Sequence, residues 1–346
     1  MARTPSERGT RPVTLSDVAR HAGVSQSTAS RVVNGSARRV GGTLEQRVLD
    51  AAAELHYTAN LQAQAVARGT TSTVALLVGD IADAYFSSMA AAVMASAKRE
   101  GLRVTVAVTE RSVEREIELV RELRGQHVRA IILAGSGYVR AERGELLIRE
   151  LEMYEQTGGK VVLVSRSDLP FDGIDLDNFG GARRLAVALS RLGYTRFHVL
   201  GGERELIATR DRIDGFRAGL AERGIELPES AVSFSDFSWE GSIRVVGQLD
   251  DDVLAATQAF FAVNDEMALG AIAGLRGRGL RIAEDIAVAG FDDIRTLRDI
   301  VPGLTTVRVP IAEVAAEAIA RIVGVSDAAP RIPATVVLRE STPRVN

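Results

Sequence analysis

The sequence predicts two structural parts: a small all-α headpiece with a helix-turn-helix, and an α/β core built on parallel, doubly wound sheets. Residues 14–34, TLSDVARHAGVSQSTASRVVN, have the apolar spacing of two short helices around a tight turn. From residue 74 onward, short apolar segments alternate with helical ones, which is typical of parallel strands covered on both faces. A length of 346 residues is enough for two or three domains.

The composition excludes several classes of protein. Charged residues make up 25% of the chain and hydrophobic residues 46%, as in ordinary globular proteins. No apolar run reaches the roughly 18 residues needed to span a bilayer. Residues 1–12, MARTPSERGTRP, lack the apolar segment of a secretory signal, so we expect a disordered tail there. The chain has no cysteine, which excludes disulfides and thiolate metal sites, and we expect neither a metal nor a cofactor.

The first two helices of the headpiece have clear start signals. Thr14 can cap the first helix, with Asp17 in the capping-box position, and Ser25 can cap the second. Gly23 supplies the left-handed backbone of the turn. The expected inner faces are Leu15, Val18 and Ala19, then Ala29, Val32 and Val33. The outer face of the second helix is Gln26, Ser27, Ser30 and Arg31. Such a helix suits the major groove of DNA, although an ordinary helical hairpin with a solvated face fits the spacing too.

A third helix over residues 43–56 would complete a headpiece of residues 13–57. Its expected inner face is Val48, Leu49, Ala52 and Leu55. Residues 1–70 carry a net charge of +4, whereas the rest of the chain carries −7. A basic head on an acidic body points to a polyanion that binds at one end only.

TLSDVARHAGVSQSTASRVVNG resembles the N-terminal helix-turn-helix of the lactose/galactose/purine repressor family, and the likeness extends from about Val13 to Pro343. The resemblance implies that the second helix reads the major groove of operator DNA. The headpiece residues that it places on DNA are Thr14, Leu15, Ser16, Ser25, Gln26, Ser27, Ser30, Arg31, Asn34 and Tyr57. At the start of the third helix the family usually has Val-Ser-x-x-Thr-Arg. Here Val-Gly-Gly-Thr-Leu-Glu follows Arg38 and Arg39, so one of these two arginines is expected to contact phosphates instead.

Residues 58–72 resemble the hinge of the family, a linker that folds into a short helix on DNA. Asn60 and Ala63 match hinge positions that lie on DNA, and Val66 matches the apolar wedge that enters the minor groove. A plain linker is the alternative. The alanines of this segment favour a helix, yet an isolated helix of this length is marginal, as a hinge that folds on binding requires.

The α/β pattern continues to the end of the chain. The expected strands are 74–80, 103–109, 130–135, 160–165, 196–202, 259–265 and 287–293, and the expected helices include 87–100, 180–192, 211–223, 240–249 and 265–277. The resemblance implies a periplasmic-binding-protein-like core over residues 73–341, with two lobes joined by three crossovers. The first lobe would be about 73–173 and 304–329, and the second about 174–303 and 330–341.

In open α/β sheets, ligands bind beyond the carboxyl ends of the strands. These ends carry carboxylates, amides, an arginine and aromatic residues, as in a sugar site, where charged groups bond hydroxyls and rings stack on the apolar face. The residues expected to contact the effector are Tyr85, Phe86, Ser136, Ser165, Arg212, Phe237, Asn264 and Asp292.

Several of these residues have structural alternatives. The resemblance supports Arg212 in ATRDRIDGF, Asn264 in VNDEMALG and Asp292 in GFDD as ligand contacts. Capping or bracing a strand end fits them too, although Asp265 is the better candidate for the helix cap. Tyr85 and Phe86 also fit core packing, and Trp239 competes with Phe237 as the second aromatic wall.

We therefore predict a sequence-specific DNA-binding transcriptional regulator, a repressor controlled by a small effector that is a sugar or sugar derivative. The alternatives are a nucleobase or a protein co-effector, and a solute-binding protein of the same core fold, which would have no use for residues 14–34. We expect no enzyme: glycine pairs 180–181 and 201–202 lack nucleotide-loop motifs, and His198 fits a core strand.

The expected partners are therefore operator DNA, the effector and a second copy of the chain. The C-terminal LRESTPRVN has no leucine heptad of the kind that tetrameric relatives carry, so we expect a homodimer. Two-fold symmetry then predicts a pseudo-palindromic operator. We expect a cytoplasmic, nucleoid-associated protein without a membrane partner.

Overall fold

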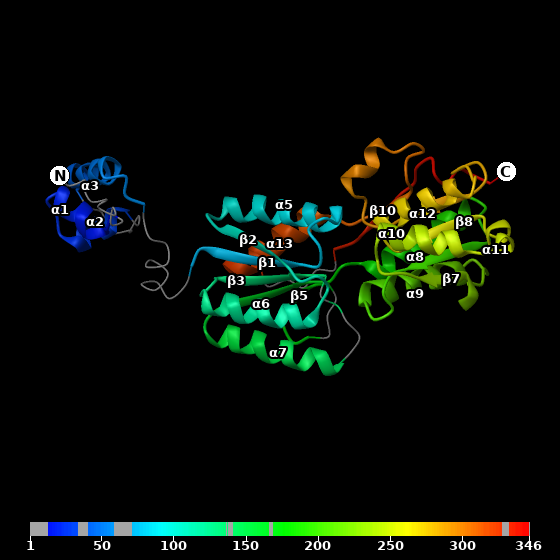
Figure 1. The fold of residues 1–346 in the computed structure, drawn as a ribbon, viewed down its shortest axis with the longest axis horizontal. Helices are drawn as coiled ribbons and strands as arrows, with labels where there is room; N and C mark the ends of the chain where they lie inside the picture. The colour runs from blue at the N-terminus through cyan, green and yellow to red at the C-terminus, as the bar shows by residue number, and fades with distance from the viewer. Residues whose placement is uncertain are drawn as a thin grey trace, which may run out of the picture. The chain divides into compact units, whose positions relative to one another are not determined.

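The structure is a computed structural model, and it describes residues 13–33, 41–58, 71–135, 137, 141–165, 169–326 and 332–345. It divides into two compact units, Met1–Thr71 and Ser72–Asn346 (Figure 1). Several predicted features lie outside the described residues: the tail 1–12, most of the hinge, and Asn34, Arg38, Arg39, Asn60, Ala63, Val66 and Ser136.

The described residues of the headpiece form three helices, α1 (Leu15–His21), α2 (Gln26–Val33) and α3 (Gly42–Glu54). The predicted capping box of α1 is present, because the Thr14 hydroxyl accepts from the Asp17 amide and the Asp17 carboxylate accepts from the Thr14 amide at 3.0 Å. The turn contains Gly23 at φ +63°. Ser25 precedes α2 and its hydroxyl accepts from the amide of Thr28 at 3.1 Å. The local start and stop signals therefore produce the predicted helices.

The headpiece core is small. Val18, Ala29 and Val48, one from each helix, are fully buried at its centre, and Ala19, Ala22 and Ala51 surround them. The predicted place of Leu49 on the inner face of α3 is wrong, because its side chain is 45% exposed. The buried stripe of α3 is Val48, Ala51, Ala52 and Leu55, at helical spacing, and residue 49 lies about 100° around the helix from residue 48.

So small a core makes the helix caps important for stability. Replacing Thr14 with Ala removes the cap of α1, which typically costs about 1 kcal/mol, whereas Thr14→Ser keeps a hydroxyl acceptor. We expect Thr14→Ala to speed amide hydrogen exchange across α1 about fivefold, and Thr14→Ser to leave it near the wild-type rate. Ser16→Ala, in an exposed position of the same helix, is the control. Unchanged exchange in Thr14→Ala would contradict the importance of the cap.

The first lobe of the core is a parallel sheet with helices on both faces (Figure 1). Its strands are β1 (Thr73–Val78), β2 (Arg103–Val108), β3 (Ala130–Ala134), β4 (Lys160–Val164) and β5 (Asp172–Ile174), in the order β2-β1-β3-β4-β5. Alternate residues of β1 enter two separate cores. Leu76 packs in the core with α5 (Ala84–Arg99) and α13 (Ile311–Val323), and Leu77 packs in the core with α6 (Val113–Gly125) and α7 (Ala141–Gln156).

The second lobe repeats this plan with a smaller sheet. Its strands are β6 (Phe197–Gly201), β7 (Val232–Phe234), β8 (Ala259–Ala262) and β9 (Ala287–Ala289), all parallel in the order β7-β6-β8-β9. Its helices pack in two pairs, α8 (Asn178–Arg191) with α9 (Ile207–Ala221) and α10 (Trp239–Gln248) with α12 (Asp265–Gly277), while α11 (Asp251–Ala256) precedes β8. The predicted α/β fold with parallel sheets is confirmed.

The chain passes between the lobes three times. It leaves β5 for α8, returns through β10 (Thr306–Arg308) to α13, and crosses again through β11 (Thr335–Val337). The strands β10 and β11 pair with each other in antiparallel register, with Arg308 opposite Thr335. In the described part of the chain, no helix has both the length and the apolar composition needed to cross a membrane.

Candidate functional site

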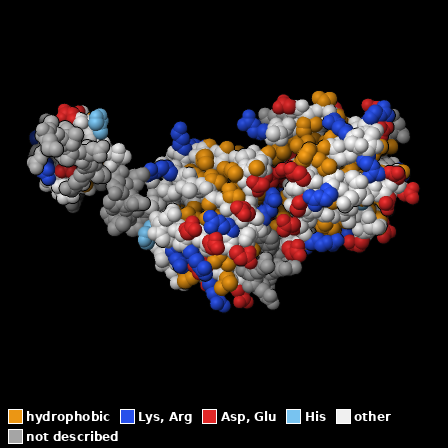
Figure 2. Space-filling view, in the orientation of Figure 1, with side chains coloured by type: hydrophobic (Ala, Val, Ile, Leu, Met, Phe, Trp, Pro, Cys, Tyr) orange, Lys and Arg blue, Asp and Glu red, His pale blue; other side chains and the backbone are white. Residues whose placement is uncertain are grey.

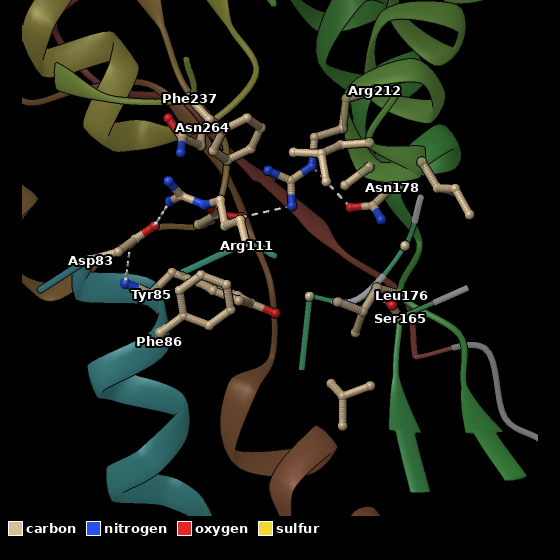
Figure 3. Close-up of a pocket in the computed structure, with 17 residues that line it drawn as sticks. Asp83, Tyr85, Phe86, Arg111, Ser165, Leu176, Asn178, Arg212, Phe237 and Asn264 are labelled. Carbon is tan, nitrogen blue, oxygen red and sulfur yellow. Dashed lines mark hydrogen bonds and ion pairs between the residues drawn. The ribbon is translucent and has the colours of Figure 1, made fainter. Parts of the chain in front are cut away.

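A cavity of about 70 Å³ lies between the two lobes of the core. Every strand of the two parallel sheets contributes to it with residues at or just beyond its carboxyl end, as open α/β sheets do at their ligand sites. Asp83, Tyr85, Phe86, Arg111, Gly135 and Ser165 come from the first lobe. Asn178, Ile207, Arg212, Phe237, Asn264 and Asp292 come from the second (Figure 3).

The guanidinium of Arg212 is the most constrained group in this cavity. It extends from α9, is 4% exposed and points between the lobes (Figure 3). Its Nε donates to Asn178 Oδ1 at 2.9 Å and its Nη1 donates to the carbonyl of Val263 at 2.6 Å. Its Nη2 lies 3.0 Å from Asp292 Oδ1, and the ring of Phe291 lies below the guanidinium at 3.9 Å. A buried cation requires such compensation.

Asp292 completes this pair from the loop after β9. Its backbone has φ +121°, a value that non-glycine residues rarely adopt, so the surrounding structure must hold it there. Burial raises the pKa of Asp292 well above its usual range, although the charge of Arg212 opposes the shift. Among the described residues, no donor is aligned for a hydrogen bond to Asp292 Oδ1. This oxygen can therefore accept from a ligand hydroxyl.

The first lobe supplies the opposite wall. Asp83 caps α5, accepting from the amide of Tyr85 at 2.8 Å, and its other oxygen lies 3.7 Å from Arg111 Nη2. The Arg111 guanidinium lies 5.6 Å from the ring centre of Phe237 in the second lobe. The amide of Ile207 in the second lobe donates to the carbonyl of Gly137 in the first at 2.7 Å. The lobes are therefore in direct contact across the cavity.

Comparison with known proteins gives this architecture a family. Residues 14–60 match the model described as "Bacterial regulatory proteins, lacI family", and residues 186–344 match "Periplasmic binding protein-like domain". The transcriptional regulator DegA of Bacillus subtilis is 30% identical over 340 residues, which cover 96% of this chain and 99% of DegA. The chain belongs to the LacI family of bacterial regulatory proteins. It is a transcriptional regulator, in keeping with the predicted family.

Other members extend the likeness to solved structures. The regulator GalR of Escherichia coli is 31% identical over 92% of this chain and 90% of GalR. A complex of the regulator CelR with cellobiose has a TM-score of 0.67 and 30% identity, covering 96% of this chain and all of CelR. The lac repressor dimer bound to operator and the anti-inducer ONPF has a TM-score of 0.81 and 27% identity, with the same coverage.

The structure places most of the predicted effector residues together. Tyr85, Phe86, Ser165, Arg212, Phe237, Asn264 and Asp292 all line the cavity. Trp239 does not line it and is 39% exposed, so Phe237 supplies the second aromatic wall. A Cβ at Gly202 would lie 1.7 Å from the Phe237 ring, which explains a glycine directly after β6. Contact with a ligand stays a prediction for each residue.

One predicted role in this site is wrong. Asp265 does not cap α12, because Asn264 is its N-cap and accepts from the amide of Met267 at 2.8 Å. The fully buried carboxylate of Asp265 instead accepts from the amide of Ile294 at 3.0 Å and from the hydroxyl of Thr306. Both asparagine and aspartate suit a cap, so the choice depended on where the helix begins.

Sequence reasoning missed Arg111 and Asn178 and gave Asp83 no role in the cavity. Arg111 follows β2 in a turn where Glu110 and Arg111 both have φ +55°, and no motif marks this conformation. Asn178 opens α8 and holds Arg212. The rule that ligands meet strand ends could have found Arg111, since it lies three residues after the strand.

The predicted DNA-contacting residues of the headpiece differ in exposure. Ser16, Ser25, Gln26, Ser27 and Arg31 are exposed, whereas Thr14, Leu15, Ser30 and Tyr57 are partly buried. Leu15 and Tyr57 pack against the headpiece core, and Thr14 and Ser25 hold helix starts. The second helix thus presents a polar surface at Gln26, Ser27 and Arg31.

His198 and Glu266 lie outside the cavity wall and have strongly shifted pKa values. Burial lowers the pKa of His198 to about 4, and its ring lies 2.9 Å from the Ser233 hydroxyl, consistent with a neutral core residue. Burial, together with the charges of Asp83 and Asp80 in the other lobe, raises the pKa of Glu266 to about 7. Arg111 opposes this shift.

Glu266 gives the stability of the core a pH dependence. Its pKa of about 7 exceeds the usual 4.5, so the folded chain keeps a proton over this interval that the unfolded chain releases. The contribution of Glu266 to the free energy of unfolding therefore rises as the pH falls from 7 to 4.5. We expect Glu266→Gln to reduce this slope in urea unfolding, leaving the slope of the other carboxyls whose pKa burial raises, Asp83, Asp265 and Asp292. Equal slopes in wild type and variant would contradict the assignment.

Proposed function

We propose that this regulator is a homodimeric repressor whose operator binding is controlled by a neutral sugar in the cleft. The observation that carries the proposal is the buried pair of Arg212 and Asp292, placed where the carboxyl ends of both sheets converge. The CelR complex with cellobiose, at 30% identity, supports a sugar as the class of effector.

The charge balance of the cavity favours a neutral ligand. Arg212 is paired with Asp292, and Arg111 lies 3.7 Å from Asp83. Two donors of Arg212 are already bonded to protein acceptors. A phosphate or carboxylate would need uncommitted cations, whereas a hydroxyl can donate to Asp292. The ring of Phe237 offers an apolar surface to a sugar ring.

The DNA-binding part of the proposal rests on α2. Gln26, Ser27 and Arg31 form an exposed polar surface on a helix whose opposite side packs Ala29 into the headpiece core. A helix of this kind fits the major groove, where arginine and glutamine bond base edges. The match of residues 14–60 to the lacI-family model supports the same role.

A dimer is supported by an apolar surface on the first lobe. The outer face of α5 exposes Ala91, Met94 and Ala95, and apolar side chains gather over this helix (Figure 2). Exposed patches of this kind mark contact surfaces between proteins. The solved lac repressor structure, at 27% identity, is a dimer bound to operator. Two copies would read the two halves of a pseudo-palindromic operator.

A ligand screen tests the effector class directly. We expect one or more neutral monosaccharides or disaccharides, from a panel that also contains sugar phosphates and purine bases, to raise the melting temperature of the chain. For the DNA-binding measurements below, the operator is a DNA sequence obtained by selecting, from a pool of random sequences, those that the chain binds. A purine that stabilises the chain while no sugar does would contradict the sugar assignment.

Phe237 and Trp239 form a matched pair for mapping the site. Phe237→Ala removes an aromatic wall of the cavity, and we expect sugar affinity to fall about fivefold, equivalent to about 1 kcal/mol. Trp239→Ala removes an aromatic residue outside the cavity and should leave sugar affinity unchanged. Isothermal titration with the sugar found in the screen measures both. Equal losses of sugar affinity in the two variants would contradict the assignment of Phe237 to the sugar site.

Arg31 tests the recognition helix. We expect Arg31→Ala to weaken binding to the selected DNA by about 1–3 kcal/mol at fixed salt, because a base or phosphate contact is lost. Arg191→Ala, which removes one positive charge at the end of α8 in the second lobe, is the control and should have little effect. Unchanged affinity in Arg31→Ala would argue against α2 as the reading helix.

A further inference from the structure

The two neighbouring aspartates after β9 serve opposite sides of their loop. Asp292 and Asp293 have φ values of +121° and +58°, so the backbone is left-handed at both residues. The carboxylate of Asp292 meets Arg212 in the cavity at 3.0 Å. The carboxylate of Asp293 accepts from Arg308 Nε at 2.6 Å and from Arg339 Nη2 at 2.5 Å. One backbone segment thus links the cavity to two arginines outside it.

Those arginines belong to the crossovers. Arg308 ends β10, and Arg339 lies two residues beyond β11. The Asp293 carboxylate is 10% exposed, and although burial opposes ionisation, bonds from Arg339 and Arg308 lower its pKa. Charge-assisted bonds to a carboxylate of low exposure are stronger than surface ion pairs. The loop and both crossover strands are therefore joined through a single side chain.

A second contact holds the same loop against β10. Thr306 is two residues before Arg308, hence on the same side of the strand, and its hydroxyl donates to Asp265 Oδ1 at 2.5 Å. Asp265 Oδ2 accepts from the amide of Ile294, the next residue of the loop, at 3.0 Å. The backbone amide of Asp292 also donates to the carbonyl of Val307 at 2.8 Å. A shift of Asp292 must therefore shift β10.

The strand β10 leads directly into the first lobe. Only Val309 and Pro310 separate it from α13, which packs against β4 and against α5. α5 is the helix whose exposed apolar face we assign to the dimer contact. The path from Asp292 through Asp293 to β10 and α13 is continuous, and each step is a peptide link, a hydrogen bond or an ion pair.

We propose that Asp293 is a positioning residue that transmits occupancy of the cleft to the crossover strands, through its bonds to Arg308 and Arg339. The proposal rests on the proposed function, because it concerns the response to the ligand that Asp292 contacts. Loss of Asp293 would leave the cavity lined as before and would uncouple it from α13. Allosteric coupling factors are typically about 5- to 150-fold, which sets the size of the expected loss.

The test compares Asp293→Ala with Asp285→Ala. Asp285 is also an aspartate of the second lobe that pairs with an arginine, Arg281, but it lies away from the crossovers. We expect Asp293→Ala to bind the screened sugar within about threefold of wild type, and to bind the selected DNA without sugar equally well. The change in DNA affinity caused by sugar should fall by about fivefold or more. Asp285→Ala should keep the full change.

Hydrogen exchange distinguishes transmission from mere stabilisation, because only loss of transmission would change where sugar slows amide exchange. In the wild-type chain we expect sugar to slow exchange in the cleft and also along 306–309 and α13. In Asp293→Ala the slowing should stay confined to the cleft. Arg308→Ala, whose arginine side chain is 56% exposed and therefore tolerant of replacement, should show the same confinement if Asp293→Ala fails to fold.

The possible outcomes distinguish a failure of the role of Asp293 from a failure of the proposed function. A wild-type chain whose DNA affinity no sugar changes would overturn both the proposed function and the role of Asp293. A responsive wild type together with a fully responsive Asp293→Ala would overturn the role of Asp293 alone. Loss of sugar binding in a folded Asp293→Ala chain would also overturn it, because Asp293 would then only hold the cavity.

Discussion

The structure of the cleft depends on the Arg212 guanidinium, a charged group that is buried between the two lobes. Arg212 is 4% exposed, and removing such a charge from water costs several kcal/mol unless its donors are satisfied. Its Nε and Nη1 donate to Asn178 and to the Val263 carbonyl, and its Nη2 is paired with the Asp292 carboxylate at 3.0 Å. These partners come from α8, from the residue after β8 and from the loop after β9. One side chain therefore fixes three separate segments of the second lobe, and with them the wall that faces the first lobe.

The headpiece has a small core and depends on local hydrogen bonds to hold its helices together. Among its described residues the core has six buried side chains, four of them alanine, so tertiary packing alone supplies little stabilisation. Caps at Thr14 and Ser25 and the bond from the Arg47 guanidinium to the carbonyl of Ala22 hold the helices at their ends. The small inner residues bring α2 close to α1 and α3, which leaves its polar side outward. The helix caps and the Arg47 hydrogen bond thus hold α2 so that its polar side faces outward.

Much of this arrangement could be predicted from the sequence, because it follows from local periodicity. The strands over residues 74–80 and 130–135 were predictable because buried parallel strands are short apolar runs. β5 and β7 have three residues each, too few to show a period. Leu49 and Asp265 were misplaced because each decision depended on one residue of helical phase or helix start. The place of Arg111 three residues after β2 was a usable signal, but its contact with Phe237 and the role of Asp293 were not predictable, since they arise from left-handed backbone and from partners far along the chain.

The central claim is that the cleft and the headpiece bind their ligands in a coupled way. Coupling between two sites must be reciprocal, so DNA has to change sugar affinity by the factor by which sugar changes DNA affinity. Isothermal titration of the wild-type chain with its sugar, alone and with saturating selected DNA, measures this factor. We predict two sugar dissociation constants that differ by about 5- to 150-fold, the same factor by which sugar changes the DNA dissociation constant. Identical sugar dissociation constants with and without DNA would contradict it.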